Sequence, residues 1–250
     1  MGYWSKSNLR NALFELKMLG HQLIYEYEKR TELLAEYNRV LSLPLWEKIA
    51  PLSFGVEIEI HPSPPDLSLI KARLSYGGIK ICQTFPDWDL TQEWALIFDG
   101  SCGYELISPI LKGSEGLAQI KKACDILKSL DCWCSKDCGF HLHVNVNYLS
   151  CEKIKAILLR YEKNSGFFNS LLDSSRHYNR HCLPIVMSYL MDKIRAADDD
   201  TSKLFEYQKT RNCVVNLLSL QTYGTIEFRQ HHGTIDYNEI EAWIGLILNF

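Results

Sequence analysis

Three short stretches of this sequence place ionisable side chains in alternation with apolar ones. They are "FGVEIEI" at 54–60 with Glu57 and Glu59, "CGFHLHVNV" at 138–146 with His141 and His143, and "TIEFR" at 225–229 with Glu227 and Arg229. Side chains alternate across a β-strand, so each ionisable pair shares one face and its apolar neighbours share the other. Each stretch is therefore predicted to be a strand with an apolar face and a chemical face.

The joint set of side chains predicts a divalent-cation site. One such glutamate is more often a solvated strand residue than a ligand, but an ordinary solvent face carries mostly Lys, Thr, Ser and Gln. Carboxylates combined with imidazoles bind divalent cations, and an oxygen-rich set favours Mg²⁺ or Mn²⁺. The residues concerned are Glu57, Glu59, Glu105, His141, His143, Glu227 and Arg229.

Glu57 and Glu59 pose a specific problem, because two carboxylates beside an apolar layer repel each other and lose hydration. Either cations lie between them or the face is simply wet. Neighbouring same-face residues of a strand lie about 6.5–7 Å apart, which suits two ions better than one. We therefore expect each glutamate to serve a different ion.

The rest of the chain supplies elements that would position these strands. A strand at 94–98 runs into a turn at Asp99-Gly100-Ser101, and an extended segment follows at 103–111. Helical patterns occupy 67–74, 114–130, 150–163, 184–196 and the segment after His232, with Ser150 as an expected cap.

Composition excludes several classes of protein. The chain has 250 residues, of which 46% are hydrophobic and 23% charged, and this composition is too apolar for disorder. A net charge of −3 argues against a nucleic-acid binder. There is no membrane-length apolar run and no signal-peptide core, so we expect a cytoplasmic protein. Nine cysteines without framework spacing suit reduced thiols.

Two domains are predicted, a helical extension at 1–50 and a catalytic domain at 51–250. Apolar residues recur at steps of three and four from Leu9 to Leu41, and we favour packing of this helix on its own domain over a dimeric coiled coil because Gly20 and Arg30 interrupt the seam. The oligomeric state stays open, with the N-terminal helix as a candidate contact.

Four motifs, in this order, carry a resemblance to a known family. "FGVEIE", "WALIFDGSCGYELISPILKG", "CGFHLHVN" and "GTIEFRQHHGTIDYNEIEAWI" resemble the amidoligases, carboxylate–amine ligases related to glutamate–cysteine ligase and glutamine synthetase, over about residues 52–249. The resemblance implies an α+β fold whose antiparallel sheet has a concave polar catalytic face flanked by helices. It also implies ATP-dependent amide formation through an acyl phosphate, with Mg²⁺ or Mn²⁺, acting on small-molecule or peptide carboxylate and amine substrates.

The resemblance also assigns roles to single residues. Glu57, His141 and Glu227 resemble the set that holds the metal on the ATP phosphates, and Glu59 and Glu105, with Asp99, resemble ligands of the metal nearer the substrate. Arg229 resembles the arginine that stabilises the transferring phosphoryl group, and His143 would face phosphate or substrate. Candidates for binding nucleotide or substrate are Arg176, Asn179, Arg180 and Ser101.

Three alternatives remain open. Cys132, Cys134, Cys138, His141 and His143 crowd together and offer a zinc site, although the C-x-C spacing is not that of a standard knuckle. A two-metal phosphoesterase or nuclease would use similar ligands without ATP. A catalytically degenerate binding module is the third, and the intact acidic set argues against it. His232 and Thr234 are expected only to shape the turn before the last helix.

Overall fold

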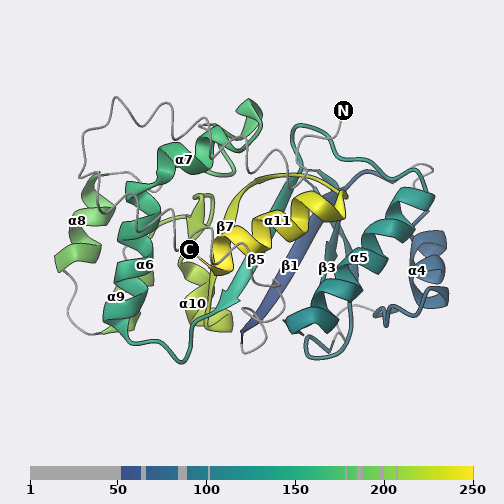
Figure 1. Ribbon diagram of the computed structural model, residues 1–250, viewed down its shortest axis with the longest axis horizontal. Helices are drawn as coiled ribbons and strands as arrows, with labels where there is room; N and C mark the ends of the chain where they lie inside the picture. Colours follow the sequence, from purple (N-terminus) through teal and green to yellow (C-terminus); the bar gives the residue numbers. More distant parts are fainter. Residues whose placement is uncertain are drawn as a thin grey trace, which may run out of the picture.

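The computed structural model describes residues 52–62, 66–83, 89–100, 102–177, 179–184, 188–196, 200–206 and 208–249. The predicted helical extension at 1–50 and the candidate Ser101 lie outside the described residues. Within them, helices and strands alternate irregularly along the chain (Figure 1). The strands are β1 (Ser53–Ile60), β2 (Ala95–Asp99), β3 (Gly103–Ile107), β4 (Leu111–Lys112), β5 (Gly139–Asn145), β6 (Val215–Asn216) and β7 (Thr225–His232). The helices are α4 (Leu67–Tyr76), α5 (Gly113–Ser129), α6 (Cys151–Lys163), α7 (Ser165–Ser170), the short 3₁₀ helix η1 (Ser174–Arg176), α8 (Ser188–Ala196), α9 (Thr201–Glu206), α10 (Leu218–Tyr223) and α11 (Tyr237–Leu248).

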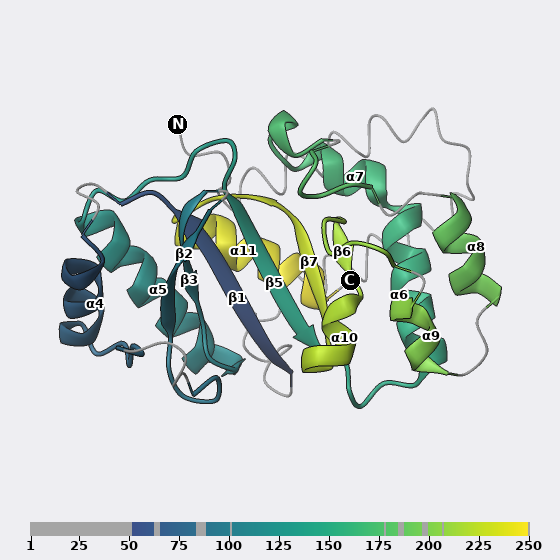
Figure 2. The same ribbon diagram turned by 180° about the vertical axis from the view of Figure 1, so that it is seen from behind.

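The strands of the described part form one antiparallel sheet in the order β2-β3-β1-β5-β7-β6, with β4 paired to the start of β1. Figure 2 shows β1, β5 and β7 side by side in front of α11. The α+β class and the antiparallel sheet predicted from the sequence are confirmed. Because β1 lies between β3 and β5, both of its glutamates have neighbours on either side.

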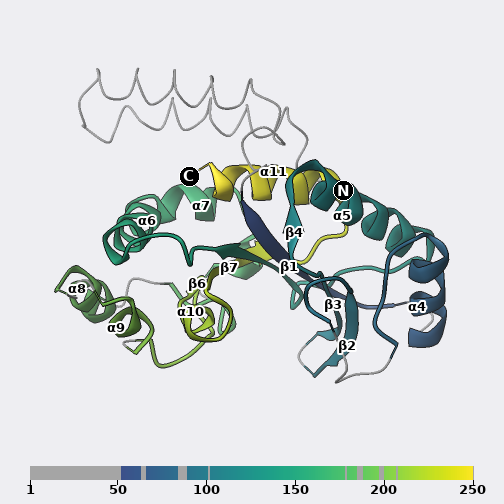
Figure 3. The same ribbon diagram turned by 90° about the horizontal axis from the view of Figure 1, so that it is seen from below.

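One face of the sheet is apolar and covered by helices. Phe54, Val56, Ile58 and Ile60 of β1 are at most 2% exposed. On this face α5 and α11 bury apolar stripes that recur every three or four residues, as expected for helices packed on a core. Gly116 lets α5 approach closely, because a Cβ there would lie only 2.8 Å from the Cβ of Leu111. Figure 3 shows the sheet arched beneath α5 and α11, so that the opposite, polar face is concave.

Several boundaries differ from those expected from the sequence. The extended segment at 103–111 is interrupted after Ile107, where Ser108 N–H bonds Val56 O, Ser108 Oγ accepts from Val56 N, and Pro109 has no N–H to donate. Strand β7 continues through His232 instead of ending at Arg229. Ser150 caps α6 as predicted, since its side chain accepts from Lys153 N.

Helices α6 and α7 pack next to β7, near the end of the sheet where β6 is the edge strand. Tyr161 of α6 stacks on Phe168 of α7 at 4.3 Å and packs against Phe228 of β7, so aromatic contacts join these helices to the sheet. The nine cysteines of the chain, all of which are described, are thiols outside any disulfide, in agreement with the reduced thiols expected. Within the described ranges, no helix is both long and apolar enough to cross a membrane.

Candidate active site

The concave face of the sheet gathers ionisable side chains from five neighbouring strands. The register sets Glu59 opposite Glu105, Glu57 opposite His141, and His143 opposite Glu227. The strand faces with ionisable side chains, predicted separately for each strand, are therefore continuous across the sheet. The side chains are Asp99 from β2, Glu105 from β3, Glu57 and Glu59 from β1, His141 and His143 from β5, and Glu227 and Arg229 from β7.

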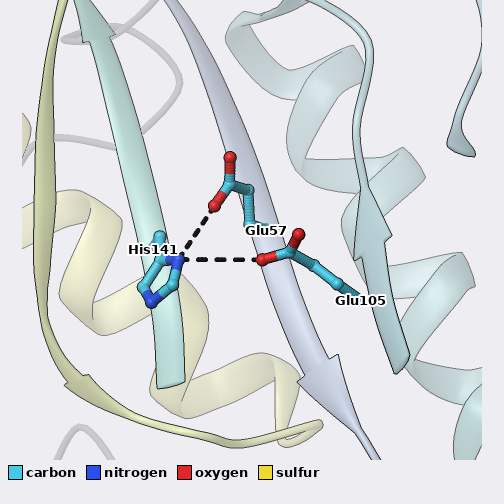
Figure 4. A group of neighbouring side chains, drawn as sticks. All are labelled: Glu57, Glu105 and His141. Atoms are coloured by element: carbon cyan, nitrogen blue, oxygen red, sulfur yellow. Dashed lines mark hydrogen bonds and ion pairs between the residues drawn. The ribbon is translucent and has the colours of Figure 1, made fainter. Parts of the chain in front are cut away.

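The first cluster with metal-ligand spacing comprises Glu57, Glu105 and His141, whose ligand atoms lie within 4.8 Å of one another. His141 Nδ1 lies 2.8 Å from Glu57 Oε2 and 3.8 Å from Glu105 Oε1. Figure 4 shows both carboxylates directed toward the imidazole from two strands. Two carboxylate oxygens and one imidazole nitrogen converge here.

A second cluster of the same spacing comprises Glu57, His143 and Glu227. His143 Nε2 lies 3.1 Å from Glu57 Oε1 and 3.9 Å from Glu227 Oε1. The other ring nitrogen of His143 is hydrogen-bonded to Thr225 Oγ1 at 3.0 Å, which fixes the orientation of the ring. Glu57 thus faces one imidazole with each of its oxygens and belongs to both clusters.

A third cluster comprises Glu59, Asp99 and Cys102. Glu59 Oε2 accepts a short hydrogen bond from the backbone N–H of Gly139, and its Oε1 lies 3.6 Å from His141 Nε2. The structure therefore places Glu57 and Glu59 in different clusters. The clusters with metal-ligand spacing pair Glu105 with Glu57 and His143 with Glu227. The pairs that the resemblance implies also lie close, since His141 Nδ1 is 3.7 Å from Glu227 Oε1 and Glu59 is opposite Glu105 in the register.

The electrostatics of the face fit a bound cation. Burial raises the pKa of Glu105, and the charges of Glu57, Glu59 and Asp99 raise it further, to about 10. Burial opposes ionisation of Glu57 too, but hydrogen bonds from His141 and His143 outweigh it and hold the pKa of Glu57 well below its usual value. Glu105 keeps its proton because it is buried among negative charges, and a divalent cation placed there would replace that proton. The oxygen-rich donor set also favours such a cation.

Arg229 supplies a fixed positive charge beside these clusters. Its Nη1 donates a very short hydrogen bond to Glu227 Oε1, and the residue is 7% exposed. Burial disfavours the charged form, but the nearby carboxylates, Glu227 foremost, raise the pKa of Arg229 above its usual value. The buried Nε has no hydrogen-bond partner among the described residues.

The candidates from the "RHYNRHC" stretch lie in different surroundings. Arg176 is 2% exposed and donates to the backbone carbonyl oxygens of Arg229 and Gln230, so it ties η1 to β7. A Cβ on Gly139 would lie 3.0 Å from Arg176 Nη2 and 2.8 Å from His141 Nε2, which brings Arg176 next to the clusters. Among the described residues, the Asn179 side chain bonds the backbone of Ser175 and His181. Arg180 is exposed, with a bond to His181.

The zinc alternative receives no support from the geometry. Across the described ranges, which include every cysteine, the clusters with metal-ligand spacing contain none of Cys132, Cys134 and Cys138. Cys134 Sγ is directed instead to the backbone oxygen of Glu59. His232 lies within β7 rather than in the turn, whereas Thr234 Oγ1 accepts from Asp236 N in the turn as expected.

Three residues at the face escaped the sequence analysis. Asn216 donates to Glu227, Thr225 orients His143, and Cys102 joins Glu59 and Asp99. Of these three, only Asn216 stands out in the sequence, because it is a single amide side chain within the apolar run "CVVNLL". The contacts of the other two depend on pairing between distant strands.

Comparison with known proteins adds one match. A family model described as "Putative amidoligase enzyme" matches residues 50–250. No curated protein and no solved structure matches the chain.

Proposed function

The chain belongs to the amidoligase family, and from this premise we propose that it is an ATP-dependent carboxylate–amine ligase that works through an acyl phosphate with Mg²⁺ or Mn²⁺. The proposed substrates are a small-molecule or peptide carboxylate and an amine. The family match confirms the resemblance found in the sequence, and the reaction is our inference from it and from the site.

One observation carries this proposal, namely that Glu57 belongs to two of the clusters with metal-ligand spacing. A carboxylate that directs its two oxygens to two clusters suits a pair of neighbouring cations. Phosphoryl transfer between two anionic groups needs such positive charge, because ATP and a carboxylate otherwise repel each other.

The residues have distinct roles in the proposed reaction. Glu57 would hold the cation on the ATP phosphates together with His143 and Glu227. Through its other oxygen it would hold a second cation, nearer the substrate carboxylate, together with His141 and Glu105. Glu59 and Asp99 would lie on the substrate side of that second cation. Arg229 would stabilise the transferring phosphoryl group, for which its planar and permanently charged guanidinium is suited. The bound cations supply charge neutralisation and Lewis acidity.

The proposed chemistry has two steps. A carboxylate oxygen of the substrate attacks the γ-phosphorus of ATP and forms an acyl phosphate. The bond between the γ-phosphorus and the β,γ-bridging oxygen breaks, and ADP leaves. The amine nitrogen then attacks the acyl carbon, inorganic phosphate leaves, and the nitrogen loses a proton. One oxygen of the carboxylate ends in the phosphate.

The test is a screen of carboxylate and amine pairs for ADP release, followed by isotope tracing. With ¹⁸O in the carboxylate, the released phosphate should carry one ¹⁸O atom. ADP release that depends on both substrates together with this transfer supports the ligase. Hydrolysis of phosphodiesters without ATP would contradict it and favour the phosphoesterase, and nucleotide binding without any turnover would favour the binding module.

A further inference from the structure

Asn216 ends the short edge strand β6 and lies opposite Glu227 in the register with β7. Its Nδ2 donates a 2.6 Å hydrogen bond to Glu227 Oε2, and its Oδ1 accepts from the backbone N–H of Leu218 at 3.0 Å. Only 5% of Asn216 is exposed. Both ends of the amide are therefore engaged, and one of them holds a carboxylate of the site.

The backbone of β6 is fixed by other side chains. Gln208 Nε2 donates to Val215 O, and Gln208 Oε1 accepts from Leu217 N, so this side chain bonds the residues on both sides of Asn216. Ser219 Oγ lies 2.9 Å from the backbone oxygen of Asn216. Since these bonds use no side-chain atom of Asn216, the strand retains them when that side chain is shortened.

The contact with Asn216 divides the two oxygens of Glu227 between different tasks. Oε2 is occupied by the amide, while Oε1 is bonded to Arg229 and lies 3.9 Å from His143 Nε2. A carboxylate tethered through one oxygen presents the other in a fixed direction. Residues that tether metal ligands in this way raise metal affinity without touching the ion.

We infer that Asn216 is a positioning residue, which fixes Glu227 so that only Oε1 faces a cation held with Glu57 and His143. The inference rests on the proposed function for the presence of that cation, although not on ATP or on the ligase reaction. It adds a residue outside the ionisable set to the machinery of the site.

The test replaces Asn216 by serine in the full-length chain. In Asn216→Ser the hydroxyl can still accept from Leu218 N, as serine does in such turns, but it is too short to reach Glu227. Asn145→Ser is the matched control, because Asn145 Oδ1 also accepts a backbone N–H two residues on, from Asn147, while its Nδ2 donates to Ser53 Oγ and not to a carboxylate. Mn²⁺ alone is titrated into metal-free protein and followed by electron paramagnetic resonance.

We expect Asn216→Ser to weaken Mn²⁺ binding about 10-fold, the lower end of the effect of such tethering residues, and Asn145→Ser to leave it unchanged. Melting temperatures in EDTA should be similar for both variants. In a Glu227→Gln background the serine at position 216 should cause no further loss, because its target is gone. Asn216→Ala provides the same series if the serine variant does not fold.

Mn²⁺ affinity equal to wild type in Asn216→Ser would overturn the inference, and so would a full additional loss in the Glu227→Gln background. Absence of any Mn²⁺ binding by the wild type would overturn it together with the proposed metal role. Mn²⁺ binding that follows the expected pattern in a protein without ligase activity would refute the proposed reaction and support the inference.

Discussion

Strand β1 divides the concave face into two sides with opposite charge balance. On the β5 side, carboxylates alternate with imidazoles and an arginine. The β3 side contributes only carboxylates and a thiol, and its carboxylates meet a basic side chain at the boundary, where His141 lies 3.6 Å from Glu59 and 3.8 Å from Glu105. The β5 side comprises Glu57, His141, His143, Glu227 and Arg229, and the β3 side comprises Glu59, Asp99, Cys102 and Glu105.

Two carboxyl groups show what this difference means. Glu57 is ionised despite burial because His141 and His143 hold its pKa well below the usual value, whereas burial and three neighbouring acidic groups raise the pKa of Glu105 to about 10. The β5 side therefore carries its own counter-charges. The β3 side needs a proton or a cation from solution, so the two sides should respond differently to metal, pH and substitution.

The largest expected effect separates the two glutamates of β1. Glu57→Gln should weaken Mn²⁺ binding by more than about 100-fold and impair Mg·ATP binding, because Glu57 serves two clusters. Glu59→Gln should leave nucleotide affinity nearly unchanged and instead raise the concentration of carboxylate substrate required. Calorimetric titration of both variants with Mn²⁺ and with Mg·ATP measures this. Wild-type binding and turnover in both variants would mean that these glutamates are only solvated strand residues without a metal or catalytic role.

Substitution of Arg229 probes the role of the permanent positive charge on the β5 side. Arg229→Lys keeps the charge but loses the planar donor pattern, so turnover should fall about 10²–10³-fold while Mn²⁺ affinity changes little. Turnover and Mn²⁺ titrations on the same preparation separate the two effects. Full activity in the lysine variant would show that Arg229 is only a counter-ion of Glu227.

Much of this face could be predicted from the sequence, because strand periodicity alone assigns side chains to faces. Glu57 and Glu59, for example, share a face in any strand that contains them. The division into two sides could not be predicted, since it depends on the register that sets Glu59 opposite Glu105 and Glu57 opposite His141. That register is fixed by pairing across β1, β3 and β5, which lie far apart in the chain.

Short elements were missed for a related reason. Strand β6 has two residues and α10 has six, too few to show a period, and both are held by contacts such as those of Gln208 and Ser219. Asn216 lies in this region, so its bond to Glu227 became visible only in the structure. The alternation of side chains predicted the long strands, whereas the short elements at the β6 edge of the sheet depend on tertiary contacts.

The β3 side should show its need for charge in the pH dependence of stability. Without metal, folded Glu105 keeps its proton up to about pH 10, whereas the unfolded chain loses it near the usual 4.5. Between these values the folded state binds more protons, so stability falls as pH rises, by at most about 1.4 kcal/mol per pH unit for one group.

Glu105→Gln should therefore flatten the decline in stability between pH 5 and pH 8 in EDTA, as measured by urea unfolding. The raised pKa of His143 also lowers stability as pH rises above its usual 6.5, but it does so equally in both proteins and cancels in the comparison. Saturating Mg²⁺ should flatten the wild-type curve in the same way, because the cation replaces the proton. Parallel curves for both proteins in EDTA would contradict the assignment.

The smallest effect is expected at Cys102, the one thiol that lies within ligand distance of Glu59 and Asp99. A cysteine binds metal as the thiolate, and a hydrogen bond with Cys138 together with burial raises the pKa of Cys102 far above the usual range. Hard cations such as Mg²⁺ and Mn²⁺ also prefer oxygen to sulfur. Cys102→Ser should therefore change Mn²⁺ affinity by no more than about twofold, while Cd²⁺, a soft cation able to displace the thiol proton, should bind the wild type much more tightly than the variant. Titration of both proteins with both ions measures the contrast. A large loss of Mn²⁺ affinity in Cys102→Ser would show that the thiolate is a ligand of the resident metal, and the β3 side would then be a mixed sulfur–oxygen site rather than a carboxylate one.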